Sequence, residues 1–151
     1  MEYLEYTAFT KASPLVAWNL FCDYRFWPSF SNLYGNIRWT KGQPWTAGSR
    51  LKIDIVEPVK TTVDHVITVC TPPERVAWID HALGNTMEQW VTFEPQPDGT
   101  TRVHTWAEIT GADPMFAANK YSDFVRAFMR QWYDSFCRAC DQLADGQAIY
   151  A

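Results

Sequence analysis

Between residues 33 and 110 the chain alternates apolar and polar residues. Leu51, Ile53 and Ile55, for example, occupy every second position, which is the spacing of one face of a half-buried strand. Turn signals such as Pro72-Pro73 and Asp98-Gly99 separate the alternating runs. With a further strand at the start of the chain, the pattern predicts strands at residues 2–10, 33–39, 51–55, 61–70, 75–81, 86–94 and 101–110.

Helical patterns occupy two other segments. Ser13-Pro14 is typical of a helix start and predicts a short helix from Leu15 to Cys22, and Pro28 should interrupt the helical path before a second short helix or turn. The segment from Asp113 to Asp145 repeats apolar residues every three or four positions. Asp113 is the expected N-cap of this helix and Asp145-Gly146 its end, so it would be long and amphipathic.

The order of these elements predicts an α+β fold. A curved sheet of seven antiparallel strands would wrap around the long C-terminal helix, with two short helices after the first strand. No repeat or low-complexity linker divides the chain, so a single domain is expected over residues 1–151. One helix need not fill such a sheet, and the remaining space would form a ligand cavity.

Composition supports a pocket and weighs against several partners. Eight Trp, seven Tyr and nine Phe are more than an ordinary core of this size requires. The net charge is −4 and there is no basic run, so neither nucleic acid nor a membrane surface is an expected partner. No apolar run approaches the roughly 18 residues of a membrane span, so membrane insertion is not expected.

Cysteine usage indicates a reducing compartment. The four cysteines follow no secretory signal peptide, which favours a cytoplasmic protein over a disulfide framework. Cys137 and Cys140 form a CxxC motif, but it falls inside the long helix without a second ligand pair. Core packing is therefore expected for both, and no metal site or cofactor is predicted.

The chain also carries turns and strand starts that resemble a known superfamily. They are Ser13-Pro14-Leu15-Val16-Ala17-Trp18, Asp23, Phe26-Trp27-Pro28, Ala47-Gly48-Ser49-Arg50-Leu51, Thr71-Pro72-Pro73-Glu74-Arg75-Val76-Ala77-Trp78, Phe93-Glu94-Pro95 and Asp98-Gly99-Thr100-Thr101-Arg102-Val103. On these motifs the chain resembles the START/Bet v 1-like (SRPBCC) superfamily, which includes polyketide cyclase/dehydratase-like and lipid-transfer proteins. The resemblance implies a helix-grip fold but no universal catalytic residue.

Strand parity predicts a polar row inside the sheet. If Leu51 faces the core, His65, Asp80 and Gln89 face it as well. A turn over residues 71–74 would place His65 opposite Asp80, and a two-residue Gly84-Asn85 turn would place Asp80 opposite Gln89. Two interpretations stay open: a ligand-facing site, or a structural patch whose polar groups satisfy one another.

The expected ligand contacts combine this row with apolar and aromatic walls. The long helix would contribute its N-terminal half, whereas Phe136, Ala139, Cys140 and Leu143 would pack in ordinary core. The predicted ligand-binding residues are Trp27, Phe30, Ile53, Ile55, His65, Trp78, Asp80, Gln89, Val91, Thr105, Tyr121, Phe124, Phe128 and Trp132.

The opposite parity places polar and aromatic residues on the convex face. His81 and Glu88 should be neighbours there, as surface residues rather than metal ligands. Trp90 and Trp106 would form an exposed apolar patch unless other side chains cover them. The alternative to such cover is a homodimer interface through these two residues.

Two functions follow. The first is binding of a small hydrophobic or aromatic molecule in the cavity between sheet and helix. The second follows from the resemblance: a polyketide cyclase, aromatase or dehydratase that uses the same cavity. In that enzyme His65 and Asp80 would be the general acid/base pair, and Gln89 or Thr105 would donate a hydrogen bond to an oxyanion.

Overall fold

The computed structural model describes residues 1–57, 60–82, 84–111 and 118–146. Seven strands form one sheet in the order β1-β7-β6-β5-β4-β3-β2, and every neighbouring pair is antiparallel. The elements in chain order are β1 (Glu2–Thr10), α1 (Pro14–Cys22), the 3-10 helix η1 (Tyr24–Ser29), β2 (Tyr34–Lys41), β3 (Arg50–Ile55), β4 (Thr61–Thr71), β5 (Arg75–Ala82), β6 (Asn85–Pro95), β7 (Thr101–Gly111) and α2 (Ala118–Ala144).

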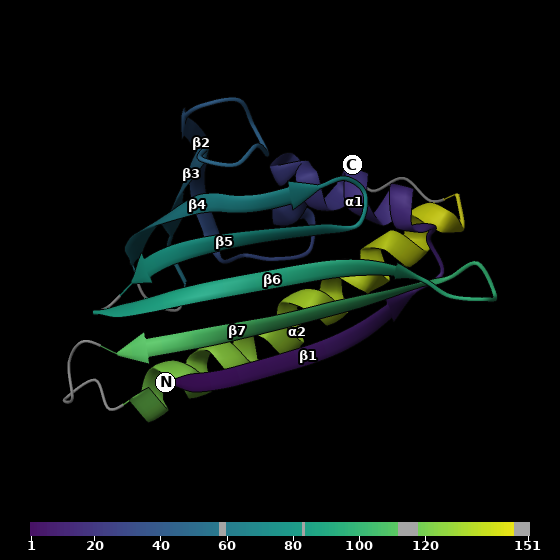
Figure 1. The fold of residues 1–151 in the computed structure, drawn as a ribbon. Helices are drawn as coiled ribbons and strands as arrows, with labels where there is room; N and C mark the ends of the chain where they lie inside the picture. Colours follow the sequence, from purple (N-terminus) through teal and green to yellow (C-terminus); the bar gives the residue numbers. More distant parts are fainter. Residues whose placement is uncertain (58–59, 83, 112–117, 147–151) are drawn as a thin grey trace.

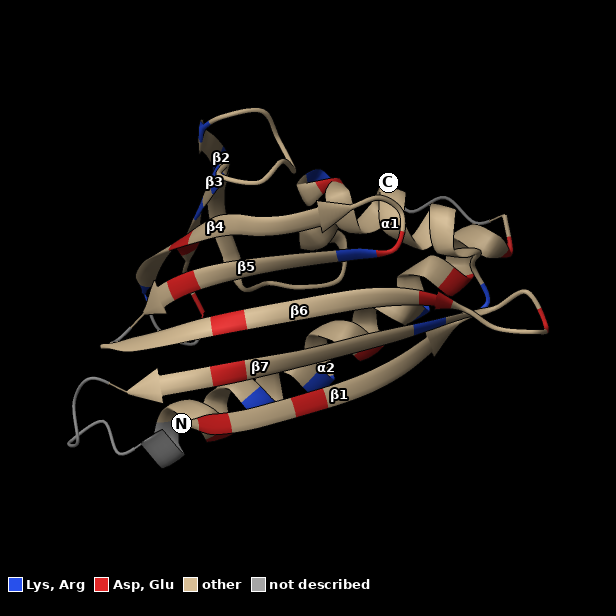
Figure 2. Cartoon of the chain, viewed as in Figure 1, with Lys and Arg blue, Asp and Glu red and all other residues tan. Residues whose placement is uncertain are grey.

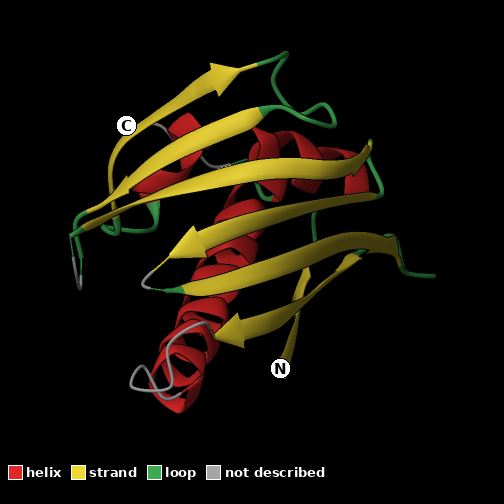
Figure 3. Cartoon of the chain, turned by 60° about the vertical axis from the view of Figure 1, so that its left-hand side comes forward, coloured by secondary structure: helices red, strands yellow, loops and turns green. Residues whose placement is uncertain are grey.

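The sheet curves around α2, which crosses its concave face (Figures 1 and 3). The two short helices lie near the C-terminal end of α2 (Figure 1). This is the helix-grip fold, as the sequence predicts. No helix in the described part of the chain is long and apolar enough to span a membrane.

The short helices follow the predicted signals. The Ser13 hydroxyl accepts a hydrogen bond from the Val16 N–H at 3.3 Å, and Pro14 opens α1. Asp23 ends α1 and caps η1, where its carboxylate accepts from the Arg25 N–H. The second short helix is present as η1, but the break between the two helices lies at Asp23 and not at Pro28, because the 3-10 segment accommodates Pro28.

Helix α2 ends where the sequence predicts. The Gly146 N–H donates to the Leu143 carbonyl oxygen at 2.9 Å, and Gly146 has a φ of 80°, which glycine adopts without strain. The predicted N-cap Asp113 lies outside the described residues. Leu143 was expected in the core but is 36% exposed; at this level of α2 it is Asp141, two residues earlier, whose side chain contacts the end of β1.

The buried face of α2 is wider than the predicted stripe. Met129 and Tyr133, each one position after a predicted cavity residue, are almost completely buried, whereas Phe124 is 38% exposed. A helix lying on a curved sheet buries a face about 100° wide rather than a narrow seam. Two hydrogen bonds fix this face against β1: Tyr6 donates to Asp134 at 2.6 Å, and Thr10 donates to Asp141 at 2.7 Å.

The β4–β5 register differs from the prediction at the turn but not at the site. Cys70 pairs with Val76 instead of Arg75, because the turn is one residue shorter than expected. An irregularity between Ile67 and Val69 then shifts the register back, so that Val66 pairs with Ile79. The two offsets cancel, and His65 lies beside Asp80 as predicted.

The β5–β6 register was predicted wrongly by two residues. Ala82 pairs with Asn85, so Gln89 lies opposite Trp78, and Asp80 lies opposite Met87. Leu83, the expected partner of Thr86, lies outside the described residues. A shift of two leaves every side chain on its predicted face, but it separates Gln89 from the expected continuous row.

Candidate functional site

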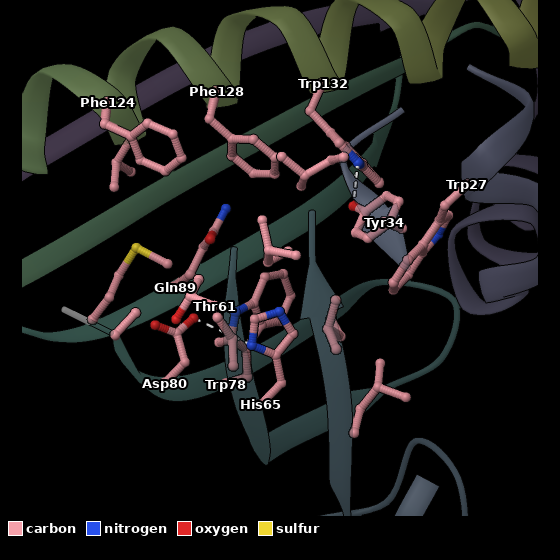
Figure 4. Close-up of a pocket in the computed structure, with 18 of the residues that line it drawn as sticks. Trp27, Tyr34, Thr61, His65, Trp78, Asp80, Gln89, Phe124, Phe128 and Trp132 are labelled. Carbon is pink, nitrogen blue, oxygen red and sulfur yellow. Dashed lines mark hydrogen bonds and ion pairs between the residues drawn. The ribbon is translucent and has the colours of Figure 1, made fainter. Parts of the chain in front are cut away.

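A cavity of about 150 Å³ lies between α2 and the concave side of β3 to β6 (Figure 4). Its walls are almost entirely apolar or aromatic. The lining residues are Phe21, Trp27, Leu33, Tyr34, Trp45, Leu51, Ile53, Ile55, Thr61, Val63, His65, Ile67, Trp78, Asp80, Ala82, Met87, Gln89, Tyr121, Phe124, Val125, Phe128, Trp132 and Tyr133.

Most of the predicted contacts are in this lining, but Phe30, Val91 and Thr105 are not. Val91 and Thr105 face inward as expected, yet both are fully buried in packed core. Phe30 packs against Phe26 and Trp132 at ring-centroid distances of 5.2 and 5.1 Å, outside the cavity. The alternation along each strand therefore predicted which side chains face inward, but not which of these are covered by packed neighbours instead of lining the cavity.

Four aromatic lining residues were not among the predicted contacts: Phe21, Tyr34, Trp45 and Tyr133. Trp45 lies in the loop between β2 and β3, where no period applies, and its indole N–H donates to the Cys22 carbonyl oxygen at 2.7 Å. A register irregularity between Tyr34 and Ile37 lets both pack against the core, whereas strict alternation assigned Tyr34 outward. Phe21 follows the residues singled out on α1, and its ring contacts Trp78.

His65 and Asp80 form the polar centre of the cavity. The His65 Nδ1 lies 3.2 Å from the Asp80 Oδ2, and the side chains are 19% and 2% exposed respectively. The contact is an ion-pair distance, and the Nδ1 is not aligned for a hydrogen bond to the carboxylate. With a proton on Nδ1, the nearby negative charge favours that tautomer and leaves Nε2 able to accept a proton. The Asp80 Oδ1 is buried and has no hydrogen-bond partner among the described protein groups.

Gln89 belongs to a separate, internally satisfied network. Its Nε2 donates to the Thr105 hydroxyl at 2.9 Å and to the Tyr133 hydroxyl at 3.2 Å. Thr105 in turn donates to the Trp90 carbonyl oxygen at 2.8 Å. The Gln89 amide N–H groups and the Thr105 hydroxyl already donate to protein acceptors. The predicted role of Gln89 or Thr105 as a donor to an oxyanion therefore does not fit this geometry.

The tyrosines of the cavity remain protonated. Burial raises the pKa of Tyr121, with the negative charge of Asp80 as a smaller cause. Burial likewise raises the pKa of Tyr34, whose hydroxyl accepts a hydrogen bond from the Trp132 indole N–H at 2.6 Å. These hydroxyls therefore add polar groups to the cavity without adding charge.

The cysteines of the CxxC motif lie in the core, as expected. Cys137 and Cys140 are buried free thiols. Burial raises the pKa of Cys137 to about 12, with smaller contributions from Asp141 and Asp134. Among the described residues, no group of three or more His, Cys, Asp or Glu side chains is placed to hold a metal ion.

On the convex face, Trp90 and Trp106 stack on each other with ring centroids 5.8 Å apart and planes 4° apart. The Trp90 indole N–H also donates to Glu88 at 3.2 Å, and His104 packs against Trp106. Both tryptophans are therefore half-buried by neighbouring side chains. His81 contacts Thr86 rather than the predicted Glu88, a consequence of the two-residue register shift.

The fold and its apolar cavity define a Bet v 1-like helix-grip protein. Over residues 1–144 the sequence matches the family described as polyketide cyclase / dehydrase and lipid transport, and the chain belongs to that family. Comparison with curated proteins finds no match.

Solved structures share the fold at low sequence identity. A hypothetical protein from Helicobacter pylori is 13% identical with a TM-score of 0.74, covering 91% of this chain and 86% of that one. Norcoclaurine synthase from Thalictrum flavum, in complex with dopamine and hydroxybenzaldehyde, is 8% identical with a TM-score of 0.73, covering 97% and 88%. Ara h 8.0201 is 13% identical with a TM-score of 0.68, covering 89% and 95%. At these identities the likeness concerns the fold.

Proposed function

We propose that this protein binds a small, largely apolar or aromatic molecule in the cavity between α2 and the sheet. The cavity itself carries the proposal, because aromatic walls with a few convergent polar groups are typical of small-molecule sites. A purely structural core would instead be close-packed. The family description, which includes lipid transport, supports the same class of ligand.

A titration with the fluorescent apolar probe N-phenyl-1-naphthylamine tests this proposal. We expect saturable binding of one probe per chain. The substitution Val63→Phe places a ring in the cavity lining and should weaken binding by at least about 10-fold, since a filled cavity excludes the probe.

Val66→Phe is the matched control for this titration. Val66 lies on the same strand with its side chain on the opposite face, so this variant should bind the probe as the wild type does. Equal binding by the wild type and Val63→Phe, with both folded by circular dichroism, would place the probe elsewhere and contradict the proposal.

A cyclase- or dehydratase-like enzyme is the second candidate, and the His65–Asp80 pair is the observation that favours it. The His65 Nε2 would take a proton from the carbon next to a ligand carbonyl, and the Asp80 carboxylate 3.2 Å from Nδ1 would stabilise the imidazolium that forms. Tyr121 keeps its hydroxyl proton and lines the same cavity, so it is a candidate donor to the enolate oxygen. Norcoclaurine synthase, a structural relative, shows that the fold accommodates an enzyme.

The homodimer through Trp90 and Trp106 stays a prediction. Acidic residues occupy β1, β6 and β7, where Arg102 is the one Lys or Arg (Figure 2). A second copy on this face would bring like charges together, which weighs against it. Sedimentation velocity distinguishes the two states: a monomer over the micromolar range would overturn the dimer.

A further inference from the structure

Three buried polar atoms of cavity residues have no hydrogen-bond partner among the described protein groups: the His65 Nδ1, the Trp78 Nε1 and the Asp80 Oδ1. The His65 Nδ1 lies 3.2 Å from the Asp80 Oδ2 as an ion-pair contact, so the inference concerns the other two atoms, on Trp78 and Asp80. Both residues line the cavity, and they are 7% and 1% exposed. The Trp78 atom is a donor and cannot accept; the Asp80 atom, in a carboxylate, is an acceptor. Buried polar groups nearly always have a partner, so this pair calls for one.

The two atoms belong to one cluster. Trp78 and Asp80 are two residues apart on β5, so their side chains leave the same face of the strand. The Trp78 ring lies against the His65 imidazole with centroids 5.1 Å apart, and that imidazole contacts Asp80. Figure 4 shows the three side chains gathered on one wall, with Phe124 and Phe128 on the helix across the cavity.

We propose that Trp78 and Asp80 form a subsite for a hydroxyl group, so that the ligand is an uncharged aromatic alcohol or phenol. The inference rests on the proposed binding function and specifies its ligand. A hydroxyl group donates to the Asp80 Oδ1 and accepts from the Trp78 indole N–H, which satisfies both atoms. A protonated amine would leave the indole N–H unpaired, and a carboxylate or ketone would leave the Asp80 oxygen unpaired.

The aromatic part of the ligand follows from the opposite wall. Phe124 and Phe128 stack along α2 with ring centroids 6.5 Å apart, which extends a flat apolar surface over the cavity. Aromatic rings favour stacked or edge-on contact with such a surface. The molecule would therefore lie with its ring against the helix and its hydroxyl toward β5.

Three matched ligands test the subsite: naphthalene, 2-naphthol and 2-methoxynaphthalene. Their affinities can be measured by quenching of intrinsic tryptophan fluorescence. We expect 2-naphthol to bind about 10-fold more tightly than naphthalene, because only 2-naphthol pairs both buried atoms. The methoxy compound accepts but cannot donate, so it should lose most of that advantage.

Trp78→Phe keeps an aromatic ring but removes the N–H donor. It should weaken binding of 2-naphthol by about 5-fold or more and leave naphthalene nearly unchanged. Trp106→Phe, on the convex face, is the control and should change neither affinity. A preference for 2-naphthol that survives Trp78→Phe would overturn the assignment of Trp78.

Failure of the subsite can be told from failure of the binding function. If naphthalene and 2-naphthol bind the wild type equally well, the cavity binds aromatic molecules but the hydroxyl subsite is overturned. If neither ligand binds, the proposed function fails together with the subsite. Tightest binding by the methoxy compound would also contradict the assigned role of Asp80.

Discussion

The imidazole of His65 lies 3.2 Å from the carboxylate of Asp80, and both side chains line a cavity whose walls are mostly apolar or aromatic. They come from adjacent strands, so the distance depends on the β4–β5 register rather than on local sequence. In such surroundings the pair is the principal group able to move a proton. Substitution of His65 or Asp80 should therefore abolish catalysis, if there is any, without abolishing ligand binding.

The first prediction concerns this separation of catalysis from binding. If the protein is an enzyme, the wild type should accelerate exchange of the methyl protons of 2-acetonaphthone for deuterium, because enolisation is the first step of aldol chemistry. His65→Ala should lower the exchange rate by at least about 100-fold, the usual contribution of a general base, and leave ligand affinity within about threefold.

Asp80→Asn should lower the same rate less than His65→Ala, because it removes the charge that stabilises the imidazolium but keeps the imidazole. Nuclear magnetic resonance follows the exchange directly. Full exchange activity in both variants would remove the acid/base role and leave a binding protein.

The second prediction concerns Trp78 as a structural element. Its ring lies between Phe21 and His65 and is 7% exposed. Trp78→Ala should lower the free energy of unfolding by about 3 to 5 kcal/mol, as truncation of a buried aromatic ring does. Urea denaturation measures this change.

Leu15→Ala is the matched control because Leu15 is 57% exposed. It should change stability by less than about 0.5 kcal/mol. A loss below about 1 kcal/mol for Trp78→Ala would show that this ring does not support the sheet.

The third prediction concerns alkaline pH. Burial raises the pKa of Tyr34 and of Tyr133 above the ordinary value of about 10. Below that value both the folded and unfolded states keep the phenol protons, and the stability is fully present. As the pH rises through about 10, the unfolded chain releases these protons but the folded chain does not, so stability declines.

Urea unfolding midpoints measured as the pH rises through about 10, together with phenolate absorbance, test this loss of stability. Tyr133→Phe removes one buried phenol and should make the pH dependence shallower, whatever its effect on stability near neutral pH. A midpoint that stays constant through this range in the wild type would contradict the account.

The fourth prediction concerns the CxxC motif. Because burial raises the pKa of Cys137 and Cys140, both thiols should stay protonated and unreactive toward Ellman's reagent in mildly alkaline buffer. All four cysteines should react once guanidinium unfolds the chain. Rapid native labelling of either helical cysteine, located by peptide mass spectrometry, would show that this part of α2 opens.

Periodicity predicted the faces of the strands better than their partners. The two-residue error at the β5–β6 turn left Asp80 and Gln89 facing inward, since strand faces repeat every second residue. It nevertheless placed Gln89 beside the wrong residue, and the amide is bound into a network with Thr105 and Tyr133 instead. Turn length, which sets the register, is only weakly encoded near Gly84.

The residues that line the cavity could be predicted only in part, and the reason is not the register of the strands. Trp45 reaches it from a loop and Tyr34 through a strand irregularity, and neither position follows a simple period. Conversely, Val91 and Thr105 have the inward parity of the lining but lie in packed core. Alternation along one strand does not report where a distant helix lies. The set of residues that line the cavity could therefore be identified only from the three-dimensional structure.

The most direct test of the central claim is a proton–nitrogen correlation spectrum of the tryptophan indoles during titration with 2-naphthol. Four indoles belong to cavity residues (Trp27, Trp45, Trp78 and Trp132), whereas Trp90 and Trp106 lie on the convex face. Binding in the cavity predicts saturable shifts of the first group and little change in the second. Shifts confined to Trp90 and Trp106, or none at all, would contradict a ligand site between α2 and the sheet.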